Sequence, residues 1–325
     1  MSLTALHDVP APAKVNLFLH VVGRRPDGFH LLQSVFLLVD WCDRLHFEIR
    51  SDGALQRHDL GPALPTDDLC LKAAHALQRA SGCPFGADIH IDKQLPWGAG
   101  LGGGSSDAAS TLLALNRLWN LRWPRERLLA LALDLGADVP FFVGGRNAFV
   151  EGIGEKLSPL PEADMPPEWL AIVKPAQAIA TPTIFASPDL VRNTRSATLA
   201  NFIADARLRA RHQQCRQQRP WQNQGQTEKD SGAVSVRQVQ GSAGFGHNDL
   251  QPPAESLCPE IAQVANWLET RFGNSRMSGS GSAVFARAGI GSQPLATWTA
   301  DELPPSWVGR LCRSLPRHPL VNWAD

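Results

Sequence analysis

A glycine-rich stretch in the first half of the chain has the residue types of an anion-binding loop. Residues 95–107 read LPWGAGLGGGSSD, with five glycines in the seven positions from 98 to 104, and an apolar helical pattern follows directly. Glycine lets the main chain turn sharply and approach a ligand closely. The first N–H groups of a helix lack intrahelical acceptors and carry the positive end of the helix dipole. We therefore predict a phosphate site here, with Ser105 or Ser106 capping the helix.

Three known phosphate-binding motifs fit this stretch only in part. Gly98, Gly100 and Gly103 match the G-x-G-x-x-G spacing of dinucleotide-binding folds, but no acidic residue ends a strand about 20 residues later. A Walker A loop would have lysine where Gly104 stands. A protein kinase would carry HRD and DFG triplets, and neither occurs. The stretch alone therefore indicates an anion site without saying which chemistry uses it.

Two ionisable residues far from the loop are candidates for phosphoryl-transfer chemistry. Asp138 follows a predicted helix and heads an apolar run, predicted as a strand, which would fix its carboxylate as a general base. Lys14 begins the apolar strand KVNLFLHVV and could supply a cation. Taken alone, Asp138 could equally cap a turn. Lys14 could equally be an edge residue whose stem is packed and whose ammonium stays in water.

The elements that must position these residues follow a mixed order. Strands are predicted at 14–22, 31–40, 43–50, 87–96, 138–160, 169–175 and within 275–289, and helices at 67–82, 105–119, 124–136, 181–190 and 248–273. Strands come first, then helices, then strands again, without regular βαβ alternation, so the predicted fold class is α+β. Residues 207–246 are rich in Gln, Arg, Gly and Ser and poor in large aliphatics, which predicts a disordered insertion.

Composition excludes several functional classes. Lys plus Arg and Asp plus Glu number 31 each, so net charge favours neither nucleic acid nor a membrane surface. No apolar run approaches the about 20 residues of a membrane span, and the N-terminus lacks the pattern of a secretory signal. The six cysteines form no CxxC pair, which is typical of reduced thiols. We expect a cytoplasmic monomer or weak homodimer with no nucleic-acid or membrane partner and no protein-held metal.

Three separated segments resemble the motifs of the GHMP kinases, the family of galactokinase and of homoserine, mevalonate and phosphomevalonate kinases. They are PAKVNLFL near the N-terminus, LPWGAGLGGGSSDAAS in the middle and RMSGSGSAVFA near the C-terminus. The resemblance implies a two-lobed GHMP kinase fold. Residues 1–165 would form a ribosomal-protein-S5-like lobe with the ATP loop. Residues 166–325 would form a ferredoxin-like lobe that contains the insertion.

The resemblance implies ATP-dependent phosphorylation of a small-molecule alcohol. ATP would bring Mg²⁺ with it and lay its triphosphate along the glycine-rich loop. Asp138 would take the proton of the acceptor hydroxyl, and Lys14 would pair with Asp138 and polarise that hydroxyl. The implied ATP-binding residues are Lys93 near the adenosine, Pro96, Gly98, Ala99, Gly100, Leu101, Gly102, Gly103, Gly104, Ser105 and Ser106.

Finer details resemble the branch of this family that phosphorylates the 2-hydroxyl of a cytidine diphosphate-linked methylerythritol. They are the stretch GRRPDGFHLLQSVF, the triple glycine and LGADVPFF. The implied substrate-binding residues are Asn16, Phe29, His30 at the cytidine edge, Thr181, and Phe185 packed on the cytosine. A homoserine or mevalonate type of kinase stays open as an alternative, although neither needs an aromatic pocket. A non-catalytic nucleotide or sugar sensor also stays open, although a sensor needs neither Lys14 nor Asp138.

Three residues raise questions within this resemblance. Phe29 stands where the family usually has tyrosine, so a hydroxyl group is missing, and Trp97 stands where the family has methionine or a small residue. Asp107 would place a negative charge in the first turn of the helix behind the loop. That charge suits the helix dipole but would repel a phosphate, so we expect the Asp107 side chain to turn away from the anion site.

Overall fold

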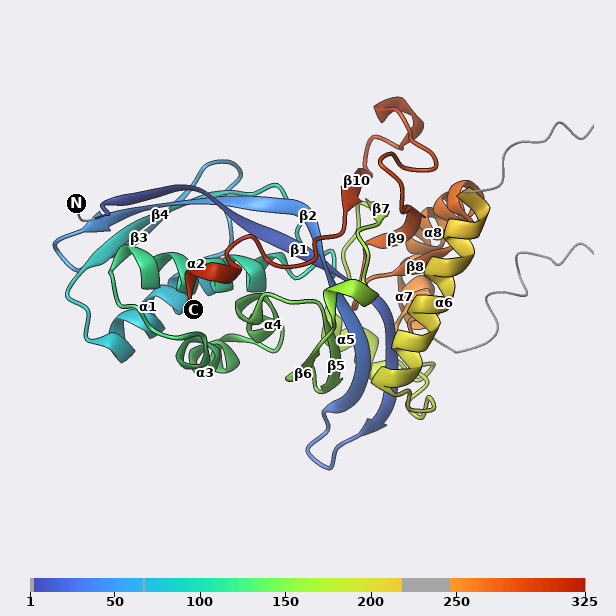
Figure 1. Ribbon diagram of the computed structural model, residues 1–325, viewed down its shortest axis with the longest axis horizontal. Coiled ribbons are helices and arrows are strands. Elements are labelled where there is room, and N and C mark those ends of the chain that lie inside the picture. Colours follow the sequence, from blue (N-terminus) through green and yellow to red (C-terminus); the bar gives the residue numbers. More distant parts are fainter. Residues whose placement is uncertain (1–2, 67, 218–245, 325) are drawn as a thin grey trace, which may run out of the picture.

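The computed structural model describes residues 3–66, 68–217 and 246–324 and contains two sheets (Figure 1). The six-stranded sheet consists of β1 (Ala5–Arg24), β2 (His30–Arg50), β3 (Leu55–Asp59), β4 (Gly86–Asp92), β5 (Ala148–Gly152) and β6 (Lys156–Pro159). The four-stranded antiparallel sheet consists of β7 (Trp169–Lys174), β8 (Ser275–Met277), β9 (Val284–Gly289) and β10 (Val308–Arg313). The predicted two-lobed α+β fold is confirmed.

The hairpin of β1 and β2 is the backbone of the first lobe. The sequence predicted separate strands at 31–40 and 43–50, but β2 is one strand of 21 residues. One edge of β2 pairs with β1 along its length, and the other edge is shared between β5 and β4. Because β1 and β2 run from one end of this lobe to the other (Figure 1), side chains near the middle of the hairpin can reach the second lobe.

Helices cover one face of the six-stranded sheet. They are α1 (Leu69–Ser81), α2 (Gly103–Leu118), α3 (Arg125–Leu135) and α4 (Val139–Gly144), and their apolar residues share one core with β1, β2 and β4. The helices predicted at 67–82 and 124–136 are confirmed as α1 and α3. The Asp68 side chain accepts the N–H groups of Cys70 and Leu71 at the start of α1, and Gly82 ends that helix with a left-handed turn.

The short helix α4 corrects the prediction of strands throughout 138–160. Pro140 lies in its first turn, and Gly145 ends it with φ of 71°. The five residues from 139 to 143 are all buried, and such a short apolar run has no periodicity that separates helix from strand. As a consequence, Asp138 lies at the N-terminal end of a helix rather than at the head of a strand.

The second lobe adds four helices to its sheet: α5 (Thr181–Ala186), α6 (Leu199–Gln217), α7 (Gln251–Leu257) and α8 (Pro259–Phe272). The helix predicted over 248–273 is two helices, because α7 ends at Leu257 and Pro259 starts α8 after one intervening residue, Cys258. The predicted insertion begins too early, since residues 207–217 continue α6. The rest of that segment, 218–245, lies outside the described residues.

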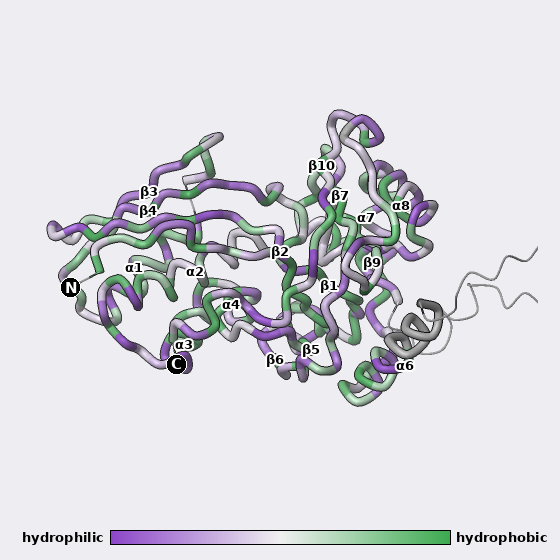
Figure 2. The backbone as a smooth tube through the Cα atoms, turned by 45° about the horizontal axis from the view of Figure 1, so that its top comes forward, coloured by the Kyte–Doolittle hydropathy of each residue, from purple (hydrophilic) through white to green (hydrophobic). Residues whose placement is uncertain are grey.

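The two lobes share a buried core. Val15 and Leu17 of β1 pack in one cluster with Ile172 of β7 and Phe285 of β9. The last residues of the chain then return to the first lobe, where Leu320 is part of its core. Figure 2 shows hydrophobic and hydrophilic residues interspersed along the chain. Within the described residues, no helix is both long enough and apolar enough to cross a bilayer.

Candidate active site

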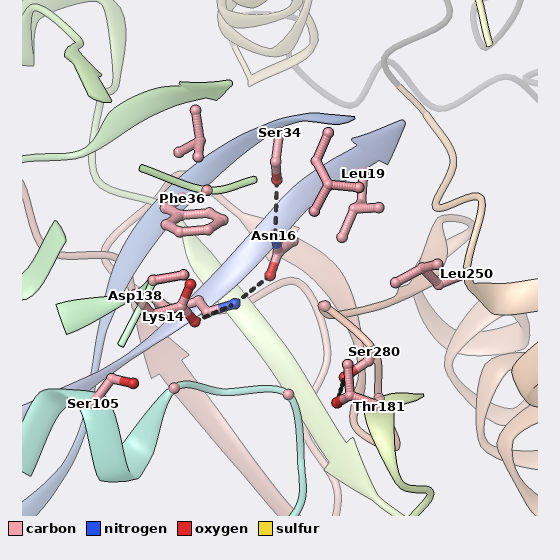
Figure 3. A pocket seen from close by; sticks show the side chains of 18 of the residues that line it. Lys14, Asn16, Leu19, Ser34, Phe36, Ser105, Asp138, Thr181, Leu250 and Ser280 are labelled. Atoms are coloured by element: carbon pink, nitrogen blue, oxygen red, sulfur yellow. Dashed lines mark hydrogen bonds and ion pairs between the residues drawn. The ribbon is translucent and has the colours of Figure 1, made fainter. Parts of the chain in front are cut away.

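A cleft of about 410 Å³ lies where the glycine-rich loop, the middle of β1 and β2, the start of α4 and the turn after β8 meet (Figure 3). The predicted site residues that line it are Lys14, Asn16, Gly98, Gly100, Gly102, Ser105, Asp138, Thr181 and Phe185. The predicted site residues that are not part of its lining are Phe29, His30, Lys93, Pro96, Ala99, Leu101, Gly103, Gly104 and Ser106. The cleft therefore joins residues that are widely separated in the sequence.

The glycine-rich loop is fixed through its carbonyl oxygens. The backbone N–H of Lys14 donates to the Leu101 carbonyl at 2.9 Å, and the Ser278 hydroxyl donates to the Gly100 carbonyl at 3.1 Å. The first bond ties the loop to β1 and the second ties it to the second lobe. With these acceptors engaged, the loop lines the cleft with Gly98, Gly100 and Gly102, and α2 begins directly after Gly102.

Two positions in this loop require glycine. Gly100 and Gly102 have φ of 71° and 72°, and a Cβ on Gly100 would lie 2.3 Å from the Ser278 carbonyl oxygen. Gly102 is also the N-cap residue of α2, and no side chain caps this end. The prediction that Ser105 or Ser106 caps the helix is wrong, because the left-handed turn at Gly102 starts α2 earlier and places both serines inside its first turn.

The start of α2 has the features of an anion site. Ser105 lines the cleft, and Ser106 is fully buried with a hydroxyl that has no hydrogen-bond partner among the described residues. The first N–H groups of a helix of this length have no acceptors within the helix, and its dipole favours negative charge at this end. A phosphate group in the cleft fits the combination of free backbone donors, the Ser105 hydroxyl and bare backbone.

A polar chain of four residues lies opposite the loop (Figure 3). The Lys14 ammonium is 3.5 Å from the Asp138 carboxylate and donates to the Asn16 side-chain oxygen at 2.5 Å. The Asn16 amide nitrogen donates to the Ser34 hydroxyl at 2.8 Å. The side chains of Lys14 and Asp138 are 5% and 29% exposed, so the ammonium is held inside the protein while the carboxylate is open to the cleft.

The two long strands explain why these side chains meet. Lys14 and Asn16 are two residues apart on β1 and therefore face the same side of the sheet, as do Ser34 and Phe36 on β2. Asn16 pairs with Phe36 in the strand register, and the Phe36 ring lies 4.5 Å from the Lys14 ammonium. Ser34 and Phe36 were not predicted as site residues. The available signal was their spacing of two within the strand predicted at 31–40.

The third family motif also contributes to the cleft. Gly279, Ser280 and Gly281 lie in the turn between β8 and β9 and line the cleft, and none of them was predicted as a site residue. The Ser280 hydroxyl is 2.7 Å from the Thr181 hydroxyl (Figure 3). This contact joins the turn to the start of α5 on the side of the cleft that faces away from the six-stranded sheet.

Two of the three predicted aromatic substrate contacts lie together. The rings of His30 and Phe185 are stacked with centroids 4.9 Å apart, and Arg192 donates to the His30 ring at 3.1 Å. Burial lowers the pKa of His30, and the positive charges of Arg192 and Arg24 lower it further. Phe29 is 58% exposed and lies outside the cleft. Of these three residues, Phe185 therefore lines the cleft, His30 stacks on it, and Phe29 lies apart.

Lys93 lies behind the loop rather than in the cleft. Its ammonium bonds to the Asp43 carboxylate and lies 2.5 Å from the Asp107 carboxylate. Burial raises the pKa of Asp107 well above its usual range, and the Lys93 charge offsets only part of this effect. A Cβ on Gly103 would lie 3.3 Å from the Lys93 ammonium. Asp107 thus faces a cation beneath the loop and is not part of the cleft lining.

Comparison with known proteins gives consistent matches along the chain. Residues 68–146 match the GHMP kinases N terminal domain, and residues 238–290 match the GHMP kinases C terminal domain. A 4-diphosphocytidyl-2-C-methyl-D-erythritol kinase of Methylibium petroleiphilum is 60% identical over 325 residues and is covered completely, as is this chain. The enzyme of the same name from an Acidovorax species is 50% identical over 324 residues, with 99% of each chain covered.

Solved structures agree with these matches. A crystal structure of a 4-(cytidine 5'-diphospho)-2C-methyl-D-erythritol kinase is 35% identical, with a TM-score of 0.65, over 86% of this chain and 89% of that one. Homoserine kinase from Cytophaga hutchinsonii shares the fold. Its TM-score is 0.59 at 15% identity, and the match covers 98% of this chain and 96% of that one. The chain therefore belongs to the 4-diphosphocytidyl-2-C-methyl-D-erythritol kinase family, a branch of the GHMP kinases.

Proposed function

We propose that this chain transfers the γ-phosphoryl group of ATP to the 2-hydroxyl of 4-diphosphocytidyl-2-C-methyl-D-erythritol, giving the 2-phosphate and ADP in the non-mevalonate isoprenoid pathway. Full-length relatives at 50–60% identity carry the name of this kinase. The observation that carries the proposal is the placement of the Lys14–Asp138 pair in one cleft with the start of α2 and with Phe185. That cleft holds a base, an anion site and an aromatic surface.

Asp138 is the proposed general base. Its carboxylate is open to the cleft, so it can accept the proton of the acceptor hydroxyl while the hydroxyl oxygen bonds to the γ-phosphorus. The bond between the γ-phosphorus and the bridging oxygen breaks in the same transfer, and ADP keeps the electron pair. Lys14 would stabilise negative charge that develops beside Asp138, because its ammonium is held there by Asn16 and Phe36.

The loop at 96–106 would bind the triphosphate through the first turn of α2. Phosphoryl transfer leaves the protein mainly the work of positioning and of charge stabilisation, and backbone N–H groups that are already oriented do both. Ser105 would add a hydroxyl donor from the cleft wall. Lys93 and Asp107, which lie behind the loop, would support its shape rather than bind the transferred phosphoryl group.

Magnesium would enter this site with the nucleotide. Among the residues that the structure describes, no group of three His, Cys, Asp or Glu side chains is placed to hold a metal ion. Mg²⁺ commonly keeps several water ligands and binds substrate phosphates together with one or two carboxylates. It would neutralise charge on the β- and γ-phosphates while the chain's own residues orient the acceptor and take its proton.

A coupled ADP-release assay with three acceptor alcohols tests this proposal. Purified protein with ATP and Mg²⁺ is expected to release ADP with 4-diphosphocytidyl-2-C-methyl-D-erythritol and to give only background rates with homoserine or mevalonate. Phosphorus NMR of the product should then place the new phosphate on the 2-hydroxyl. Turnover with homoserine or mevalonate, but not with the cytidyl substrate, would overturn the substrate assignment and leave the kinase assignment intact.

A further inference from the structure

Arg192 has no part in the mechanism above, yet its guanidinium is almost fully engaged at the Phe185 end of the cleft. Nη2 donates to the carbonyl oxygens of Phe185 at 2.9 Å and Ser187 at 2.8 Å. Nη1 donates to the carbonyl of Leu190 at 2.9 Å, and Nε donates to Nε2 of His30 at 3.1 Å. Three of these acceptors lie at or just beyond the C-terminal end of α5, where helix carbonyls lack partners within the helix.

The contact between Arg192 and His30 determines which nitrogen of the imidazole carries the proton. A guanidinium group can only donate, so Nε2 of His30 must accept with its lone pair. The ring is then neutral with its proton on Nδ1, and the nitrogen left for a ligand is a donor. The charges that act on this ring come from Arg192 after α5 and from Arg24 at the end of β1, and both oppose an imidazolium.

Arg192 contacts both members of the stacked pair. It holds Phe185 through the main chain and His30 through the ring, and these two rings lie 4.9 Å apart at an interplanar angle of 25°. Phe185 lines the cleft, so any movement of this pair changes the wall against which a flat ligand would pack. No other side chain in the described hydrogen bonds contacts both the end of α5 and the His30 ring.

We propose that Arg192 is a positioning residue for the pyrimidine base, which it serves by fixing the His30–Phe185 pair and holding His30 as the neutral Nδ1–H tautomer. A donor at that edge suits cytosine, which offers acceptors at N3 and O2, better than uracil, whose N3 carries a hydrogen. The identity of the base rests on the proposed function. The contacts of Arg192 with the end of α5 and with His30 do not depend on the proposed function.

Calorimetric binding of CDP and UDP to the full chain tests this role in three variants. Arg192→Ala is expected to weaken CDP binding by about tenfold or more and to reduce the preference for CDP over UDP. Arg192→Lys should fall between wild type and Arg192→Ala, because one ammonium cannot reach acceptors arranged for a fork. Arg195→Ala is the matched control, since Arg195 is an exposed arginine in the same segment, and it should bind CDP like wild type.

Two further readouts separate positioning from a general loss of structure. ATP affinity should change by less than about twofold in every variant, because Arg192 does not touch the glycine-rich loop. CDP binding by Arg192→Ala should strengthen as pH falls from about 7.5 to about 5.5, because an imidazole that Arg192 no longer fixes presents Nδ1–H once it is protonated, while wild-type binding stays level. If Arg192→Ala does not fold, Arg192→Lys carries both measurements.

The outcomes distinguish this inference from the proposed function. Wild-type protein that bound CDP, with Arg192→Ala and Arg192→Lys unchanged in affinity and in pH profile, would overturn the role of Arg192 and leave the kinase assignment standing. Wild-type protein that bound neither nucleotide would contradict the cytidyl substrate and this role together. Equal weakening of CDP and ATP binding would show that Arg192 only maintains the fold, which also overturns the proposal.

Discussion

At the scale of single residues, Lys14 connects the parts of the cleft that the proposed chemistry needs. Its ammonium lies beside the Asp138 carboxylate and donates to Asn16, while its backbone N–H donates to Leu101 of the glycine-rich loop. One residue thus relates the position of the base to the position of the anion site. The lysine is buried, and its neighbours Asn16 and Phe36 keep the ammonium in one place.

Replacing Lys14 by methionine should separate charge from packing. Methionine keeps an unbranched stem of similar length, so the thermal midpoint of unfolding should change little, while kcat should fall by about 100-fold or more. Steady-state ADP release and a melting curve on the same sample measure the two effects. A Lys14→Met protein that melts normally and turns over at the wild-type rate would show that the ammonium has no part in the reaction.

At the scale of elements, the glycine-rich loop and α2 form one unit whose shape depends on close backbone approach. Gly100 touches the turn between β8 and β9, so the loop can exist in this form only if that turn of the second lobe is in place. Gly102 starts α2 in a left-handed conformation. Both features direct the first turn of α2 toward the cleft, where Ser105 is exposed to a ligand.

Substitution of Gly100 by alanine should damage this unit, and Gly104→Ala is the matched control. At Gly100 a Cβ would meet the Ser278 carbonyl oxygen at 2.3 Å in a left-handed conformation, so we expect a loss of about 1–3 kcal/mol of stability and a raised KM for ATP. At Gly104 the nearest atom would be 4.0 Å away in a helical turn, and alanine should leave stability equal or slightly higher.

Denaturant unfolding of both variants checks this prediction. The expected result is a lower midpoint for Gly100→Ala alone. Equal midpoints for the two variants would mean that the contact between the loop and Ser278 does not constrain the chain.

Helices that have a residue typical of a helix start at one end and a glycine just after the other end were predictable from the sequence. Asp68 and Gly82 bound α1, and Pro124 and Gly136 bound α3, each within two residues of the predicted ends at 67–82 and 124–136. The helix α4 was not predictable, because its apolar residues are buried on every side and show no period. The prediction of two separate strands at 31–40 and 43–50 was also wrong, because both edges of the single strand β2 are paired with strands that are distant in the sequence.

The candidate site was predictable to a similar degree. Lys14, Asp138 and the loop came from residue types and from the family resemblance, and the structure brings them together. The residues that hold them, such as Ser34 and Ser278, were not found. Their roles depend on which side chains face each other across strands and lobes, and no local pattern in one sequence carries that information.

At the scale of the whole molecule, the end of the chain supports the element that carries the proposed base. His318 is fully buried, its backbone N–H donates to the Gly145 carbonyl at 2.9 Å, and Gly145 ends α4. Its Nδ1 accepts the Leu320 N–H at 3.1 Å, and Leu320 lies in the core of the first lobe. The last residues therefore pack against α4, so their docking affects how firmly Asp138 is placed.

This docking should make the protein less stable in acid. Burial lowers the pKa of His318 to about 3, and the charge of Arg125 adds to this effect. An unfolded chain protonates this residue near pH 6.5, so from there down to about pH 3 the unfolded state binds more protons. The free energy of unfolding should therefore fall as pH falls through this window, by at most about 1.4 kcal/mol per pH unit from this group.

The variant His318→Asn isolates that contribution. Asparagine offers an acceptor near the position of Nδ1 and does not titrate, so its free energy of unfolding should depend less steeply on pH than that of wild type. Urea unfolding of both proteins at about pH 7 and about pH 5 gives the two slopes. Identical slopes would mean that His318 is not held neutral in the folded chain.

The most direct test of the central claim is the turnover of Asp138→Asn with ATP and 4-diphosphocytidyl-2-C-methyl-D-erythritol. Asparagine keeps the size and polarity of the side chain at the start of α4 but cannot accept the acceptor's proton. If Asp138 is the general base, kcat should fall by at least about 100-fold, while KM for either substrate changes by no more than about threefold. A kcat near that of wild type would contradict the role of Asp138 as general base, because phosphoryl transfer would then proceed without its carboxylate.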